Sequence, residues 1–172
     1  MTAQRVAQFR RMPPTQLYIV RHAVAEDMSE TGDDASRRLT KKGRKAFVRL
    51  VRQLRSAGME VDLIASSPLV RTRETAAALA EELGGRPPVE VVDALAPGSD
   101  WRALAAWTSR QDAHHVAWVG HAPCVGHLVA QAIGAGAAGV MMHKGAVASI
   151  RLPAGIGQPG DLEWLATPDL VE

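Results

Sequence analysis

Short apolar segments that alternate with longer amphipathic ones restrict the fold of this sequence more than any other feature. Four continuous apolar runs are bounded by turn residues: 17–20, 62–66, 88–92 and 116–119. Such runs are typical of strands that are covered on both faces of a sheet. Two later segments, 146–152 and 162–166, also predict strands, and we expect the last one to form a sheet edge.

Helical segments lie between these runs. The predicted helices cover residues 41–57, 68 to about 84, 100–109 and 123–133. Thr40 is a good N-cap for the first helix and Gly58 a good stop, Pro68 suits a first helical position, and Ser99 can cap the third helix. Alternating strands and helices predict an α/β, three-layer sandwich, with a mostly parallel central sheet and helices on both faces.

Composition agrees with one globular domain. The chain has 172 residues, of which 47% are hydrophobic and 22% charged, so a core of useful size can form. We expect a flexible leader at residues 1–14, basic but without the apolar segment of a signal peptide, and a single domain at residues 15–172. No apolar run reaches the roughly 20 residues that cross a bilayer, so no membrane contact is expected. One cysteine, Cys124, excludes an intrachain disulfide and fits a cytoplasmic protein.

Charged and polar residues follow three of the predicted strands. Arg21 and His22 follow the first strand, Arg71 lies in the first turn of the helix after the second, and Gly120-His121 follows the fourth. Ligands of parallel sheets bind beyond the carboxyl ends of the strands. Two arginines and two histidines at one such edge would form a cationic pocket for a small dianion, such as a phosphoryl group.

Each of these residues also has an ordinary structural interpretation. Arg21 could be a surface arginine at a strand end, and His22 could be a hydrogen-bonded structural histidine. Arg73 competes with Arg71, but Arg71 is favoured because helical side chains lean toward the N-terminus and hence toward the strand ends. The functional interpretation depends on their common position at one predicted edge.

Three ordered blocks in the sequence resemble a known family. Residues 17–23 (LYIVRHA) resemble the opening "RHG" block of the histidine phosphatase superfamily, with Ala23 where glycine is commoner. Residues 66–75 (SSPLVRTRET) resemble the "SSPxxRxxET" block, and residues 119–123 (VGHAP) resemble the "xGHxP" block. The short chain and residues 37–43 (RRLTKKG) point to the small phosphohistidine phosphatases, the SixA-like branch. The resemblance covers about residues 15–152.

The resemblance implies a phosphoglycerate-mutase-like fold and a metal-independent phosphatase without cofactors. It implies that His22 is the nucleophile and becomes phosphorylated, and that Arg21, Arg71 and His121 bind the phosphoryl oxygens. Arg37, which precedes the "LT" pair at one residue's distance, is assigned to the mouth of the phosphate site as a substrate-binding residue. The implied substrate is a phosphorylated protein, such as a histidine-containing phosphotransfer domain, or a small phosphorylated molecule.

Other functions remain open at this stage. The scaffold could be a catalytically silent module that binds phospho-ligands, or a phosphatase of small-molecule esters. His121, Cys124 and His127 are spaced by three residues and could belong to a metal-dependent hydrolase, but no carboxylate accompanies them in sequence. Nine basic and no acidic residues lie between Arg37 and Arg55, which indicates either a solvated helix face or a docking surface for an acidic partner. Aromatic residues do not interleave with them, so we expect no nucleic-acid binding. The sequence does not predict an oligomeric state.

An ester substrate would also require a proton donor for its leaving group. Ala94 occupies the position where the branch often has a carboxylate, and Asp93, Glu26 and Asp27 are the carboxylates near the rim in sequence. Their ordinary interpretation as solvated loop acids is favoured. A phosphoramidate needs less acid assistance than an ester, and we therefore expect a preference for N–P bonds and activated aryl phosphates over alkyl phosphates.

Overall fold

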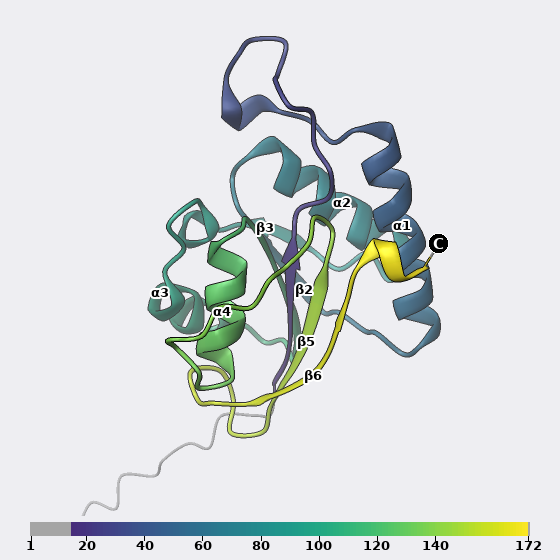
Figure 1. Cartoon of the computed structure of the whole chain (residues 1–172). Helices are drawn as coiled ribbons and strands as arrows, with labels where there is room; N and C mark the ends of the chain where they lie inside the picture. Colours follow the sequence, from purple (N-terminus) through teal and green to yellow (C-terminus); the bar gives the residue numbers. More distant parts are fainter. Residues whose placement is uncertain (1–14, 172) are drawn as a thin grey trace, which may run out of the picture.

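The structure is a computed structural model and describes residues 15–171. A six-stranded sheet in the order β3-β2-β4-β1-β5-β6 forms its centre (Figure 1). The strands are β1 (Thr15–Arg21), β2 (Leu63–Ser66), β3 (Val89–Val91), β4 (His115–Gly120), β5 (Val147–Leu152) and β6 (Asp161–Ala166). The first four run parallel, β5 is antiparallel to β1, and β6 is antiparallel to β5. The mostly parallel sheet that the sequence predicted is therefore confirmed.

Helices cover both faces of this sheet. They are α1 (Lys41–Ser56), α2 (Val70–Leu83), α3 (Trp101–Thr108) and α4 (Cys124–Ala132), and three short 3₁₀ turns accompany them, η1 (Asp34–Ser36), η2 (Asp93–Leu95) and η3 (Pro168–Val171). Figure 1 shows α1 and α2 on one side of the sheet and α3 and α4 on the other. Alternate residues of each central strand feed two separate cores, one under each helical layer. The three-layer sandwich is thus observed.

The core under α3 and α4 is organised around Trp118 on β4. This side chain is fully buried and packs edge-on against Trp101, with ring centroids 5.6 Å apart. Its indole Nε1 donates to the hydroxyl of Thr108 at 3.1 Å, so the polar atom of a buried ring is satisfied. The contact anchors both ends of α3 to the middle of the sheet.

Helix ends show where local sequence signals were sufficient and where they were not. The Thr40 hydroxyl accepts from the Gly43 N–H at 2.9 Å, and Gly58 follows the end of α1 at φ +97°, as expected. Helix α2 begins at Val70 and not at Pro68. The Ser67 carbonyl accepts from the Thr72 hydroxyl, and residues 67–69 precede the helix. Helix α3 is capped by Asp100 and not by Ser99, since the Asp100 carboxylate accepts from the first backbone N–H groups.

The strand β3 differs from the prediction. We expected residues 88–92 to be covered on both faces, but all three residues of β3 are exposed, Val89 to 40% and Val91 to 54%. The reason is topological: β3 is the last strand at its side of the sheet and pairs with β2 alone. At the opposite side, β6 is the edge strand that the sequence predicted.

The basic residues of α1 partly find partners within the fold. Arg44 pairs with Glu81 at 2.6 Å and Arg52 with Glu82 at 2.7 Å, both on α2. Part of the basic charge is therefore neutralised by the neighbouring helix, which favours the solvated-face interpretation at these positions. The docking surface stays a prediction. The expected leader at residues 1–14 lies outside the described residues, and within residues 15–171 no helix is both long and apolar enough to cross a membrane.

Strand register brings the polar strand ends together. Arg21 on β1 lies opposite Gly120 on β4, and Ser66 on β2 lies opposite Val119. The ladder continues for one more bond on each side: the His22 N–H donates to the Gly120 carbonyl at 3.0 Å, and the Ser67 N–H to the Val119 carbonyl at 3.1 Å. The residues just beyond three parallel strands thus share one rim.

On the α4 side of the rim, the backbone around Val140 packs directly against helix α4. Gly126 in α4 lies so close to Val140 that an added Cβ would overlap the Val140 carbonyl oxygen. The neighbouring Met142 carbonyl accepts from the Arg21 guanidinium Nη1 at 2.8 Å. Residues 140–142, which accept the Arg21 hydrogen bond, therefore pack against α4 at a position where glycine leaves room for them.

We predict that Gly126→Ala lowers the free energy of unfolding by about 1–3 kcal/mol, because the new methyl group forces backbone apart in a packed region. The matched control is Gly136→Ala in the following loop, where a Cβ would meet nothing within 4 Å. Urea unfolding of both variants beside the wild type measures the difference. Equal stability of the two variants would contradict the packing argument.

Candidate active site

The candidate active site is built around His22, at the carboxyl end of β1. Its side chain is 6% exposed, and its Nδ1 lies 2.7 Å from the Ala23 carbonyl oxygen. A carbonyl oxygen only accepts hydrogen bonds, so the ring proton is on Nδ1. The neutral tautomer that results has its lone pair on Nε2. A nucleophilic nitrogen is therefore oriented by a main-chain contact.

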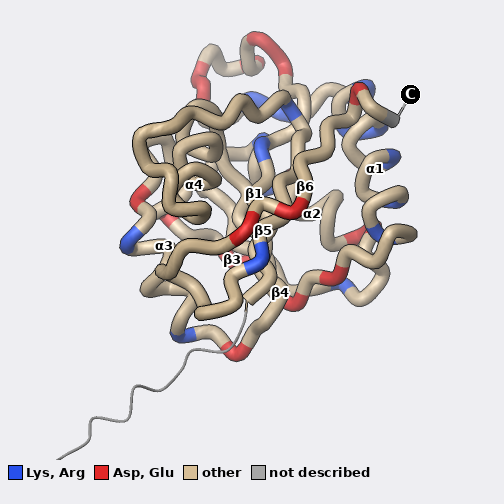
Figure 2. The backbone as a smooth tube through the Cα atoms, turned by 60° about the horizontal axis from the view of Figure 1, so that its bottom comes forward, with Lys and Arg blue, Asp and Glu red and all other residues tan. Residues whose placement is uncertain are grey.

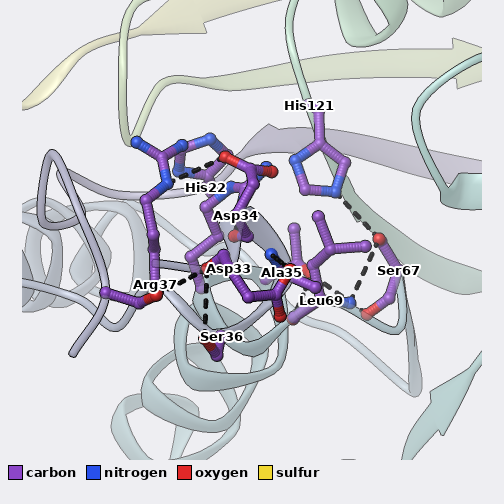
Figure 3. Close-up of polar contacts among 12 residues, drawn as sticks. His22, Asp33, Asp34, Ala35, Ser36, Arg37, Ser67, Leu69 and His121 are labelled. Atoms are coloured by element: carbon purple, nitrogen blue, oxygen red, sulfur yellow. Dashed lines mark hydrogen bonds and ion pairs between the residues drawn. The ribbon is translucent and has the colours of Figure 1, made fainter. Parts of the chain in front are cut away.

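His121, beyond the end of β4, faces His22 across the site. The two ring centroids are 5.4 Å apart, and His121 is 4% exposed. Its Nε2 lies 2.8 Å from the hydroxyl of Ser67, which stands beyond the end of β2 (Figure 3). When Ser67 donates to Nε2, the proton of neutral His121 is on Nδ1, a buried nitrogen without an acceptor in the protein.

Two arginines complete the predicted set. Arg21 donates through Nη1 to the Met142 carbonyl, and its Nε is buried without an acceptor. Arg71, in the first turn of α2, is 5% exposed, and its Nε is also buried without an acceptor. Arg71 rather than Arg73 therefore takes the inward position, as the lean of helical side chains predicted.

The buried polar atoms that lack a hydrogen bond are informative as a group. Within residues 15–171 they are Arg21 Nε, Arg37 Nε, Arg71 Nε and His121 Nδ1. Buried donors in folded proteins are nearly always paired, so unpaired ones call for an explanation. All four belong to residues that the sequence assigned to one anion site. A bound anion with several oxygen acceptors would satisfy Arg21 Nε, Arg71 Nε and His121 Nδ1 together, whereas Arg37 Nε already lies beside a carboxylate.

Asp34 is a residue of this site that the sequence reasoning missed. Arg71 donates through Nη1 to the Asp34 carbonyl at 2.7 Å and through Nη2 to Asp34 Oδ2 at 3.0 Å. Arg37 Nε forms an ion pair with Asp34 Oδ1 at 2.9 Å, off the direction of a hydrogen bond. Figure 3 shows the Asp34 carboxylate joined to Arg37, and its other oxygen pairs with Arg71 at 3.0 Å. The spacing of three residues between Asp34 and Arg37 was the available signal, since it lets both side chains meet on a helical turn.

The other carboxylates lie elsewhere. Asp93 is exposed at the start of η2, and Glu26 accepts from the Arg38 N–H at 3.4 Å. Asp27 accepts from Arg37 through its main-chain carbonyl at 3.5 Å. Within residues 15–171, none of these three carboxylates forms a hydrogen bond or ion pair with His22 or His121. Their interpretation as solvated loop acids fits these positions.

The electrostatics of the site favour neutral imidazoles and bound anions. Burial lowers the pKa of His22 to about 4. The repulsion that would arise if His121 were protonated as well, and the charges of Arg71 and Arg21, act in the same direction, although the bond to Ala23 opposes the shift. Burial and the charge of Arg71 likewise lower the pKa of His121 to about 4. Burial also lowers the pKa of Arg21. Desolvation raises the pKa of Asp34, but the hydrogen bond and charge of Arg71 outweigh it, so the net pKa is below its usual range.

The three residues of the metal-binding hypothesis do not lie together as a set of ligands. His121 faces His22, Cys124 Sγ accepts from the Gly98 N–H at 3.2 Å, and His127 is exposed on α4. No group of three His, Cys, Asp or Glu side chains is placed to hold an ion within residues 15–171. The spacing of these three residues in sequence therefore does not produce a metal site in the fold.

Comparisons with known proteins agree with the fold and the strand-end blocks. The sequence profile of the histidine phosphatase superfamily (branch 1) matches residues 17–97. An uncharacterized protein of Picosynechococcus is 37% identical over 128 residues, which cover 72% of this chain and 76% of that protein.

Solved structures extend the comparison to the whole domain. The protein histidine phosphatase SixA, solved in complex with tungstate, superposes with a TM-score of 0.78 at 25% identity and covers 92% of this chain and 100% of its own. A phosphoglycerate mutase from Bacillus anthracis shares the fold, with a TM-score of 0.67 at 13% identity over 94% of this chain and 96% of its own. The profile match and the SixA structure show that the chain belongs to the histidine phosphatase superfamily and is SixA-like within it.

Proposed function

We propose that this protein is a metal-independent phosphohistidine phosphatase that works through a phosphorylated His22. The observation that carries the proposal is the convergence of buried, unpaired donors of Arg21, Arg71 and His121 around a neutral imidazole. Donors fixed in this way stabilise charge that develops on phosphoryl oxygens without reorganising during the reaction. The similarity to SixA, whose structure holds tungstate, a tetrahedral oxyanion like phosphate, supports it.

The reaction takes two displacements. In the first, His22 Nε2 attacks phosphorus, the P–Nε2 bond forms, and the bond from phosphorus to the leaving nitrogen or oxygen breaks. In the second, water attacks phosphorus, the P–Nε2 bond breaks with its electron pair returning to Nε2, and the attacking water gives one proton to the solvent. Inorganic phosphate is released, and His22 is neutral again. Arg21, Arg71 and His121 hold the equatorial oxygens in both steps, and Arg37 contributes positive charge at the mouth.

The leaving group favours phosphohistidine as the substrate. When the second ring nitrogen of a phosphohistidine carries a proton, the departing imidazole is neutral and needs no proton from the enzyme. An alkyl ester releases an alkoxide, which needs a proton donor worth about 10²- to 10⁴-fold in rate. We infer that a phosphorylated protein, such as a histidine-containing phosphotransfer domain, is the natural partner. Hydrolysis of small-molecule esters and silent phospho-ligand binding are the competing functions.

One comparison of substrates separates these functions. The full chain is assayed on a phosphohistidine peptide, p-nitrophenyl phosphate and a sugar phosphate, each with and without EDTA. We expect turnover of the first two, little of the third, and no effect of the chelator. Efficient hydrolysis of the sugar phosphate would place the enzyme among ester phosphatases, and no hydrolysis of any substrate would leave the silent module.

We predict that His22→Asn abolishes turnover while the protein stays folded, because the variant lacks the imidazole Nε2 that takes the phosphoryl group. Loss of a nucleophile costs several orders of magnitude in rate. Rapid quenching of the wild type with radiolabelled substrate should trap label in an acid-labile, base-stable linkage that His22→Asn lacks. The matched control, His127→Asn, changes an exposed histidine on α4 and should retain both. Label that survives acid would identify a hydroxyl nucleophile instead.

We predict that Ser67→Ala reduces kcat/KM by about 10- to 100-fold, somewhat less than direct removal of a donor to a developing oxyanion. The variant leaves His121 Nε2 without its hydroxyl partner, so the Nδ1 proton is no longer fixed toward the site. Ser66→Ala serves as the control, because that buried hydroxyl donates to the Ser67 carbonyl and not to a histidine. Equal kinetics of the two variants would remove Ser67 from the site.

The two low imidazole pKa values predict an acid-sensitive fold. Between pH 6.5 and about 4 the unfolded chain binds protons at His22 and His121, while the folded chain keeps both neutral. The unfolded state therefore gains protons as the pH falls, and the free energy of unfolding falls with it. We predict that His22→Gln lowers this pH slope by up to about 1.4 kcal/mol per pH unit, the contribution of one proton. Urea unfolding at pH 7 and pH 5 measures it, and parallel curves for variant and wild type would refute the shift.

A further inference from the structure

The contact between Asp34 and Arg71 has the form of a bound ligand. Arg71 is 5% exposed, whereas the side chain of Asp34 is 66% exposed, so a carboxylate from the surface reaches a buried guanidinium. Both terminal nitrogens of Arg71 donate to this one residue, at 2.7 and 3.0 Å. One acceptor is the Asp34 main-chain carbonyl and the other is its carboxylate, so Asp34 fills both positions at which two oxygens of a phosphoryl group could accept from Arg71. Arg37 approaches the other carboxylate oxygen.

We propose that Asp34 is an internal anion that competes with the phosphoryl group for Arg71 and Arg37 and thereby sets the affinity of the site for small phosphates. The proposal rests on the proposed function in taking Arg71 as a phosphoryl-binding residue. A dianion and Asp34 cannot occupy the two Nη groups together, because the carbonyl and the carboxylate of Asp34 already fill them and the two negative charges would repel. Binding therefore requires Asp34 to withdraw.

The segment that carries Asp34 is built to withdraw as a unit. An isolated bridge between Ala25 and Leu39 closes its base, and the Leu39 N–H donates to Glu74 on α2 at 2.7 Å. Figure 1 shows the segment as a loop that projects beyond the end of the sheet, above α2. The base is thus fixed, while the tip extends away from the packed layers.

Contacts within the segment keep its tip in one shape. The Ser29 and Ser36 hydroxyls both donate to the Asp33 carbonyl, at 2.6 and 3.0 Å, and Arg37 Nη1 donates to the Glu26 carbonyl at 3.1 Å. In the described chain, the hydrogen bonds and ion pairs that residues 27–37 make outside residues 26–38 all go to Arg71. Release of this one partner frees the tip without breaking its internal contacts.

The competition has a defined consequence for ligands. A site whose competent form is only a fraction of the population binds with an apparent Kd increased by the reciprocal of that fraction. Free phosphate offers only its oxygens to offset the loss of the Asp34 contact. A phosphoryl group on a protein brings further surface to the rim. Asp34 therefore weakens the binding of both ligands by the same factor. The further contacts of a protein-borne substrate offset that loss, whereas the free product has none that do.

The pH range of the competition follows from its charges. The groups that face the Asp34 carboxylate are Arg71, Arg37 and, farther away, His121. Arg71 and Arg37 hold the pKa of Asp34 below its ordinary value, so the carboxylate stays charged throughout the neutral range. Competition therefore persists at working pH and is not a pH switch.

Asp34→Asn tests the proposal with Asp33→Asn as the matched control. Both variants remove one negative charge from neighbouring positions of the same turn, but the Asp33 carboxylate accepts from the Ala35 N–H and does not pair with an arginine. Isothermal titration of the full-length protein with inorganic phosphate measures affinity without turnover. We expect Asp34→Asn to bind phosphate at least about tenfold more tightly than the wild type, and Asp33→Asn to remain within about twofold.

The outcomes separate this inference from the proposed function. Unchanged or weaker phosphate binding by Asp34→Asn overturns the competition, as does an equal gain in both variants, which would reveal a general charge effect. A fall in kcat without a change in phosphate affinity would make Asp34 a proton donor and also overturn it. If the wild type hydrolyses no phosphohistidine but Asp34→Asn still binds phosphate more tightly, the proposed function fails and the competition stands.

Discussion

Parallel pairing of β1, β4 and β2 is the constraint on which the rest of the site depends. Each ladder bond sets where the next strand ends, so the register that places Arg21 opposite Gly120 also places His22 beside His121. Arg71 joins them because α2 starts directly above the end of β2. No long loop is needed to carry these four residues to one place. Precision in the site therefore comes from backbone hydrogen bonds in the most buried part of the molecule.

The same constraint concentrates positive charge where water is scarce. Two arginines and two histidines are buried or half-buried within one rim, and a protein usually avoids such an arrangement. The fold tolerates it because the imidazoles are neutral and because Asp34 supplies a compensating charge. The two apolar cores, well filled on both faces of the sheet, supply the stability that this region does not. Figure 2 shows acidic residues along the edge strand β6, where Asp161 and Glu163 pair with Arg151 on β5 and not with the arginines of the rim.

Sequence reasoning succeeded where the signal was local or periodic. The six strands, the sandwich and the common rim of Arg21, His22, Arg71 and His121 all follow from apolar runs and the residues that end them. It failed for the exposure of β3, because an apolar run does not tell a central strand from an edge strand. It also failed for Asp34. A 3₁₀ turn of three residues carries almost no periodicity, and the partner of Asp34 lies 37 residues farther along the chain. Such a pairing is decided by tertiary structure.

The bridge between Ala25 and Leu39 has a consequence for how such an enzyme can diversify. The bridge holds the two ends of a surface segment next to each other at the edge of the packed fold, so both ends can keep their positions when the segment between them changes. Insertions and exchanges between the two ends leave the strand ladder and the position of His22 intact, because surface loops tolerate changes that packed elements do not. The residues at the strand ends and the residues of the surface segment can therefore change independently in evolution, so ligand selection can vary while the chemistry of the site is kept.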